Sequence, residues 1–74
     1  MTKQFKIGEY AIGGIIKVST KNSQVKIEAI DYEDKHTLIT GYYDINNRNS
    51  INEFLNELTS CYYADKITDY IYNN

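Results

Sequence analysis

The spacing of hydrophobic residues changes from a period of two to a period of about 3.6 near residue 50. Before the change, apolar and polar residues alternate as in a strand with one buried face, most clearly where Val25, Ile27 and Ala29 alternate with charged residues. The pattern predicts an α+β fold in one domain over residues 1–74. We expect a three- to four-stranded antiparallel meander over residues 1–45, followed by a helical part over residues 50–72.

Four segments of the first part have the composition of strands, which is rich in β-branched and aromatic residues. The expected strands cover residues 5–12, 15–20, 25–32 and 36–45. Gly13 and Gly14 mark a turn or bulge between the first two, because glycine accepts positive φ. In the last strand one face is expected to hold Thr37, Ile39, Tyr43 and Ile45, which places Tyr42 on the other face. Short connections favour a meander.

The helical part begins with a capping signal. Ser50 and Glu53 fit the S-x-x-E box, in which the two side chains bind the first free N–H groups of a helix. The apolar stripe that follows, at the spacing i, i+3, i+4, i+7, contains Ile51, Phe54, Leu55 and Leu58.

The apolar stripe changes direction in the second half of this segment. On a straight helix a second set would lie nearly opposite the first; it contains Tyr63, Ile67, Tyr70 and Ile71. Two arrangements bury both sets. Either the chain breaks near residues 59–63 and a second helix turns back to the core, or one continuous helix buries its second half against another chain.

The size of the chain limits how it can be stabilised. A domain of 74 residues buries only about 60% of the surface of its unfolded chain. Cys61 is the only cysteine and His36 the only histidine, so neither an internal disulfide nor a four-ligand zinc site is expected. Dense packing and homodimerisation remain as the two ways to stabilise the fold. We expect no metal and no cofactor.

Sequence features also suggest where the protein works. No apolar run approaches the roughly 18 residues of a membrane span, and we expect no membrane partner. The first residues lack the apolar core of a signal peptide, and a lone cysteine fits a reducing cytoplasm. Tyrosine, with 8 residues, is over-used, and so are Ile, Asn and Lys. The codons of all four amino acids are A/T-rich, which points to an AT-rich phage or mobile-element gene.

No residue pattern supports an enzyme. His36 and Cys61 lack a visible base, acid or activating cation beside them. The acidic turn at residues 31–34 lacks the ligand spacing of a calcium loop. We therefore expect no catalytic residue.

The tyrosines favour a protein-binding role, because tyrosine joins a large apolar ring to a polar tip. The residues expected at an interface, within or between chains, are Tyr62, Tyr63, Ile67, Tyr70 and Ile71. The leading hypothesis is a small non-catalytic protein-binding module, encoded by a phage or mobile element, that modulates or inhibits a host protein.

Charge supports a different hypothesis. Residues 1–26 contain five lysines and one acid, whereas residues 27–74 contain nine acids and three basic residues. The stretches 5–8, 24–32 and 51–55, with Gly41 between, resemble the transcriptional-coactivator (positive cofactor four) family, which binds single-stranded DNA on a curved sheet and dimerises through its helix. The resemblance implies nucleic-acid contacts from Lys6, Tyr10, Lys17, Lys26 and Tyr42. Glu9 and Glu28 interrupt these lysines, which makes this the second hypothesis.

Overall fold

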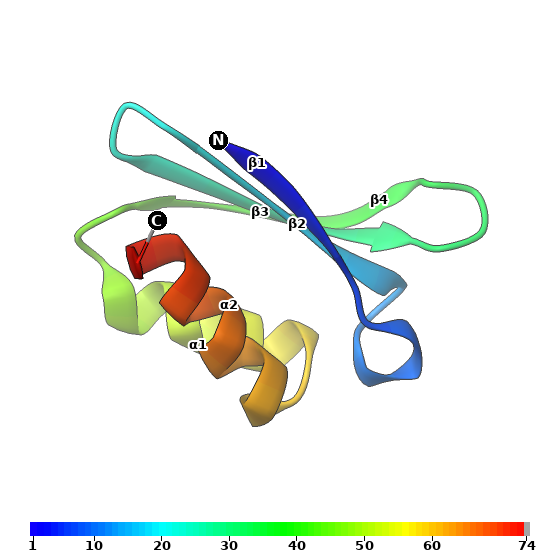
Figure 1. The fold of residues 1–74 in the computed structure, drawn as a ribbon. Coiled ribbons are helices and arrows are strands. Elements are labelled where there is room, and N and C mark those ends of the chain that lie inside the picture. The colour runs from blue at the N-terminus through cyan, green and yellow to red at the C-terminus, as the bar shows by residue number, and fades with distance from the viewer. Residues whose placement is uncertain (74) are drawn as a thin grey trace.

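A computed structural model describes residues 1–73 and contains a four-stranded sheet followed by two helices (Figure 1). The strands are β1 (Thr2–Lys6), β2 (Gly14–Lys21), β3 (Gln24–Asp31) and β4 (Thr37–Asp44). A short 3₁₀ turn, η1 (Gly8–Tyr10), lies between β1 and β2, and the helices are α1 (Arg48–Leu58) and α2 (Cys61–Asn73). The predicted α+β class and antiparallel meander are therefore confirmed.

The sheet has the order β1-β2-β3-β4, and all neighbouring strands are antiparallel. The β2–β3 hairpin turns through Asn22 and Ser23, whose φ angles of 52° and 65° are those of the mirror-image turns that match strand twist. Gly13 and Gly14 also have positive φ, as expected for the turn before β2.

Both helices lie on one face of the sheet, and the core lies between the two layers (Figure 1). The strand residues in this core alternate along β2 and β3, as their sequence predicts. The buried core residues are Ile16, Val18, Val25, Ile27, Ala29, Ile51, Leu55, Leu58, Ala64, Ile67 and Ile71. The opposite face is not covered by any helix or strand of residues 1–73 (Figure 1).

The helical segment breaks at Thr59, so the first of the two arrangements is confirmed. Thr59 is extended, with φ −151° and ψ −174°, and forms a short antiparallel bridge to Ala11. The break lets α2 return over the sheet with Ile67 and Ile71 facing the core. Both apolar stripes are thus covered within one chain.

Three local predictions are wrong. The first strand ends at Lys6 and not at Ile12, because Gly8 has φ 72° and starts the 3₁₀ turn. The predicted cap at Ser50 is replaced by an earlier start. The helix begins at Arg48 and Asn47 occupies the cap position without a side-chain cap hydrogen bond.

The earlier start of α1 has visible tertiary causes. The N–H of Asn47 donates to the carbonyl of Asp44 at 2.9 Å, which turns the chain directly into the helix. Arg48 lies 4.7 Å from the ring centre of Tyr72 and 3.4 Å from a carboxylate oxygen of Asp69, so the first turn is held against α2.

The third wrong prediction concerns the face of Thr37. A bulge between the pairs of Ala29 and Ile30 lets Ile39 pair with Ala29 while Thr37 pairs with Ile30. Leu38 is the extra residue. Thr37 therefore lies on the face opposite Ile39, and its hydroxyl donates to Glu28 at 3.2 Å.

Candidate protein-interaction surface

The uncovered face of the sheet contains four of the five residues expected to contact nucleic acid. Because paired residues share a face, the register places Lys6, Lys17, Lys26 and Tyr42 opposite the helices. Tyr42 is 68% exposed, and the Nζ of Lys26 lies 5.7 Å from its ring centre. Lys26 also pairs with Glu28 at 3.7 Å, so part of the positive charge is neutralised locally.

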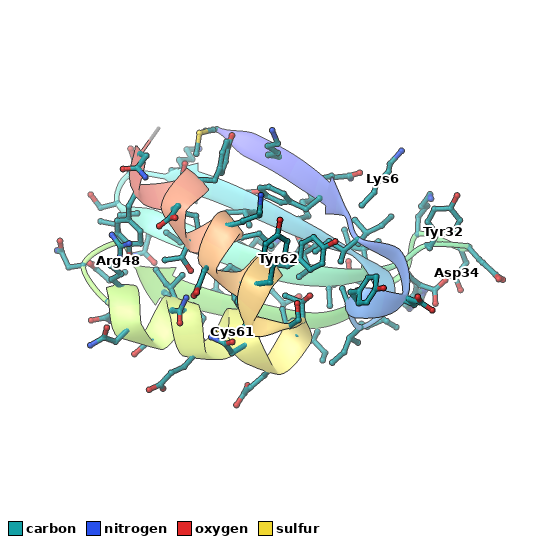
Figure 2. All side chains as sticks on the ribbon, turned by 60° about the horizontal axis from the view of Figure 1, so that its bottom comes forward. Lys6, Tyr32, Asp34, Arg48, Cys61 and Tyr62 are labelled. Atoms are coloured by element: carbon teal, nitrogen blue, oxygen red, sulfur yellow. The ribbon has the colours of Figure 1, made fainter. Side chains whose placement is uncertain are left out.

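The fifth residue, Tyr10, does not lie on this face. Its ring centre is 5.9 Å from that of Tyr63 on α2, on the helix side of the sheet. Tyr63 in turn contacts Tyr62 edge to face at 5.1 Å. We call Tyr10, Tyr62 and Tyr63 the tyrosine cluster; Tyr10 is 57% and Tyr62 62% exposed, and Tyr63 is half-buried. Figure 2 shows Tyr62 on the helix side, well away from Tyr32.

Backbone contacts fix the loop that carries Tyr10. The N–H of Ile12 donates to the carbonyl of Leu58 at 2.8 Å, and Ala11 pairs with Thr59. The hydroxyl of Thr59 donates to the carbonyl of Tyr10. The end of α1 therefore holds the loop in place beside the start of α2.

A shallow groove of about 340 Å³ adjoins the cluster. Its lining comes from the η1 loop and the end of α1: Glu9, Tyr10, Ala11, Ile12, Glu57, Leu58 and Thr59. Ile12 is 42% exposed, and both charged residues are acidic and exposed. The groove thus combines several apolar side chains with negative charge.

Comparisons of the chain with protein-family models, with curated proteins and with solved structures found no match. The resemblance to the single-stranded-DNA-binding family therefore stays a prediction.

The remaining predicted interface residues have different environments. Ile67 and Ile71 are buried in the chain's own core, because α2 packs on the sheet, and a partner cannot contact them in this fold. Tyr70 is half-buried and meets Phe5 edge to face at 5.5 Å, with the Nζ of Lys3 at 5.0 Å from its ring centre. Of the predicted set, Tyr62 and Tyr63 are brought together with Tyr10.

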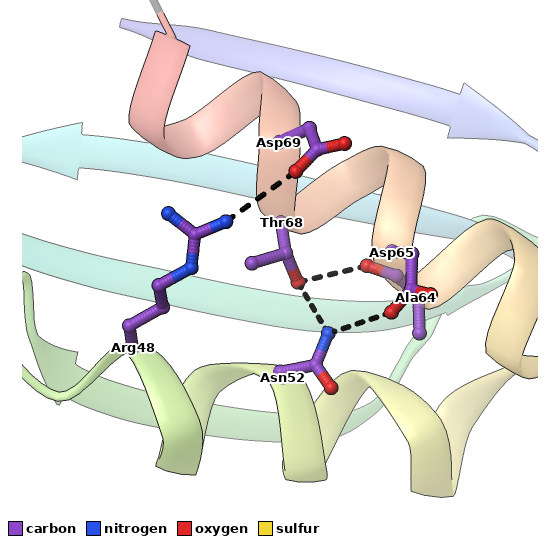
Figure 3. A network of polar contacts seen from close by, with 6 residues as sticks. All are labelled: Arg48, Asn52, Ala64, Asp65, Thr68 and Asp69. Carbon is purple, nitrogen blue, oxygen red and sulfur yellow. Dashed lines mark hydrogen bonds and ion pairs between the residues drawn. The ribbon is translucent and has the colours of Figure 1, made fainter.

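A second groove, of about 530 Å³, lies between α1 and α2 and is lined by polar residues, some of which Figure 3 shows. The amide of Asn52 donates to Asp65 at 3.2 Å and to the hydroxyl of Thr68 at 2.9 Å. That hydroxyl donates to the carbonyl of Ala64 at 2.8 Å. These groups satisfy one another's hydrogen-bonding capacity, so the network joins the two helices. Among residues 1–73 no buried side-chain polar atom is left without a partner and available to a ligand.

In residues 1–73, neither the side chain of His36 nor that of Cys61 contacts a group that would activate it for catalysis. His36 is exposed, and its backbone N–H donates to a carboxylate oxygen of Asp34 at 2.9 Å. The thiol of Cys61 is exposed and lies 3.7 Å from a carboxylate oxygen of Asp65, which offers no positive charge to stabilise a thiolate. Residues 1–73 contain no group of three metal-ligating side chains, and no helix among them is long and apolar enough to span a membrane.

Tyr72 links the C-terminal helix to the end of the sheet and provides a test of the packing. Its hydroxyl donates to the carbonyl of Ile45 at 2.6 Å. Burial raises the pKa of Tyr72 above its usual value of about 10, while Arg48 lowers the pKa and Asp44 raises it. A raised folded-state pKa means that folding favours the neutral phenol, so this stabilisation is present below about pH 10 and is lost as pH rises through the folded-state pKa.

We expect Tyr72→Phe to cost about 1 kcal/mol at neutral pH, through the lost hydrogen bond, and to weaken the alkaline loss of stability. Some slope remains, because burial and then Glu57 raise the pKa of Tyr43. Urea unfolding at several pH values between about 8 and 11 measures both effects. An unchanged alkaline slope would show that Tyr72 does not titrate with folding.

Proposed function

We propose that the chain is a non-catalytic protein-binding module whose contact surface is the tyrosine cluster with its acidic groove. The observation that carries the proposal is the fixed position of two exposed tyrosines, Tyr10 and Tyr62, around the half-buried Tyr63. Tyrosine is among the residues that contribute most to binding energy, and it loses little side-chain entropy when it binds. A rigid loop reduces the ordering cost further.

The chemistry of the groove defines the partner. Glu9 and Glu57 favour a positively charged segment, and Ile12 with the tyrosine rings favours an apolar side chain within it. Lys66 already lies 4.9 Å from the ring centre of Tyr62, which illustrates how these rings attract cations. We therefore expect a partner protein that offers an apolar residue flanked by lysine or arginine.

The biological setting is part of the proposal. The lone cysteine suggests a reducing cytoplasm, and the A/T-rich codon usage implied by the composition suggests a phage or mobile element. In that setting we propose that binding modulates or inhibits a host protein.

A matched pair of double variants tests the function. We expect Tyr10→Ala with Tyr62→Ala to weaken partner binding by at least about thirtyfold, the effect of losing a typical aromatic anchor of about 2 kcal/mol. Tyr32→Ala with Tyr42→Ala removes two other exposed tyrosines and should change affinity less than about threefold. A captured partner is titrated with each variant by calorimetry. Equal loss in both pairs, or loss only in the second, would contradict the proposed surface.

A second candidate is a single-stranded nucleic-acid-binding protein, favoured by the shared face of Lys6, Lys17, Lys26 and Tyr42. On this hypothesis, an oligonucleotide gel-shift should show binding that falls steeply with salt, since phosphate neutralisation releases counterions. Lys17→Glu should abolish that binding while Lys66→Glu on α2 leaves it unchanged. The absence of any shift at low salt would remove this candidate.

A further inference from the structure

The two edges of the sheet differ in how they are protected against pairing. β4 is an edge strand, and the segment from Thr37 to Tyr43 contains no charged residue and no proline. At its end the carbonyl of Asp44 already accepts from the N–H of Asn47, but in residues 1–73 no turn or loop hydrogen bond reaches the outer side of the stretch from Thr37 to Tyr43. A free edge of this kind exposes a row of unpaired N–H and C=O groups to any matching strand.

β1, the opposite edge, is guarded. It has only five residues, and Lys3 and Lys6 are exposed on it. Lysines and short length are the usual means by which proteins prevent edge pairing. A β4 strand that paired with β1 of another copy would meet these charges and would also leave a free edge for further growth.

Exposed apolar side chains lie along β4 as well. Leu38, Ile39 and Tyr42 are all exposed. The bulge at Leu38 disturbs the first part of the strand, and the carbonyl of Asp44 is occupied, so a regular ladder is available from Ile39 to Tyr43. The ring of Phe54 lies against the backbone of Gly41, so an apolar side chain from a paired strand would meet that ring.

We propose that β4 pairs antiparallel with β4 of a second copy, which joins two sheets into one of eight strands. A second copy fits this edge better than a charged partner strand does. The segment carries no charge from Thr37 to Tyr43, so self-pairing there brings no like charges opposite one another. Two-fold pairing also closes the assembly, because it uses the unguarded edge of each copy and leaves only β1 outside. This inference goes beyond the proposed function and does not use the tyrosine cluster.

Light scattering across a concentration series, with two matched threonine variants, tests the pairing. We expect the wild-type chain to approach twice 8.6 kDa as concentration rises. Thr40→Lys places a charge at the centre of the proposed interface and should weaken dimerisation by about tenfold or more. Thr2→Lys makes the same change on the guarded edge and should leave dimerisation unchanged, as should Tyr10→Ala with Tyr62→Ala.

Hydrogen exchange of the wild-type chain keeps the test independent of whether Thr40→Lys folds. Amides on the outer side of β4 should exchange more slowly at high concentration, whereas those of β1 should not change. A wild-type mass of 8.6 kDa at the highest soluble concentration would overturn the proposal. Equal weakening by both lysine variants, or protection confined to β1, would overturn it too.

Discussion

Replacing Ile67 with alanine lowers the free energy of unfolding by about 2–5 kcal/mol, the usual cost of a buried isoleucine lost from a well-packed core. Ile67 is 1% exposed and lies where α2 meets the sheet. A domain this small has only about 5 kcal/mol or little more to lose, so the variant should be close to unfolding at room temperature.

Tyr62→Ala on the same helix is the control for Ile67→Ala. Its side chain is mostly exposed, and we expect a loss below about 1 kcal/mol from the contacts with Tyr63 and Lys66. Urea unfolding followed by circular dichroism measures both variants. A larger loss at Tyr62 than at Ile67 would mean that α2 presents the other side to the sheet.

Gly13→Ala should destabilise the fold by about 2–5 kcal/mol, which combines a positive-φ cost with a steric clash. Gly13 has φ 75°, and a Cβ there would lie 2.7 Å from both the carbonyl oxygen of Ile30 and a methyl carbon of Leu38. The carbonyl oxygen of Ile30 cannot move away without disturbing β3, so relieving the clash costs free energy.

Gly8→Ala separates the two contributions. Gly8 has nearly the same φ, 72°, but no atom beyond its own chain neighbours lies within 4 Å of an added Cβ. It should lose only about 1–2 kcal/mol, the conformational part alone. Thermal unfolding of both variants gives the difference, and equal losses would show that Gly13 is not tightly enclosed.

The regular part of the fold can be predicted from the sequence because the hydrophobic pattern there is periodic. Alternation in β3 predicts that Val25, Ile27 and Ala29 lie on the buried face, and the reversal between Leu58 and Ile67 predicts either a break in the helix or burial against a second chain, of which the structure has the break. Each signal repeats over several residues, so the pattern is stronger than the preference of any single residue.

The wrong predictions fall where tertiary contacts override local preference. Ser50 and Glu53 form a plausible cap, yet Arg48 gains contacts with Tyr72 and Asp69 that extend the helix toward its start. The apolar residues Ile7 and Ile12 resemble a strand continuation, but Gly8 turns the chain between them. The bulge that moves Thr37 to the other face of the sheet does not show in the hydrophobic period of the sequence.

Only part of the candidate site can be predicted from the sequence. The excess of tyrosine predicts Tyr62 and Tyr63, but the family resemblance places Tyr10 among the contacts on the sheet, in agreement with the strand predicted over residues 5–12. Glu9 and Ile12 lie between Gly8 and Gly13, both of which have positive φ in the structure. Glycines at these two positions favour a loop, so the sequence does contain an indication of where this pair lies. The position of Glu57 beside this loop follows only from the contact between Ala11 and Thr59.

Mapping tyrosine nitration by mass spectrometry, with and without the bound partner protein, tests the proposed binding surface most directly. In the free chain Tyr10, Tyr32, Tyr42 and Tyr62 should all react, because all four are exposed. Partner binding should protect Tyr10 and Tyr62 and leave Tyr32 and Tyr42 as reactive as before. Protection of Tyr32 or Tyr42, with Tyr10 and Tyr62 still fully reactive, would place the partner elsewhere and contradict the account.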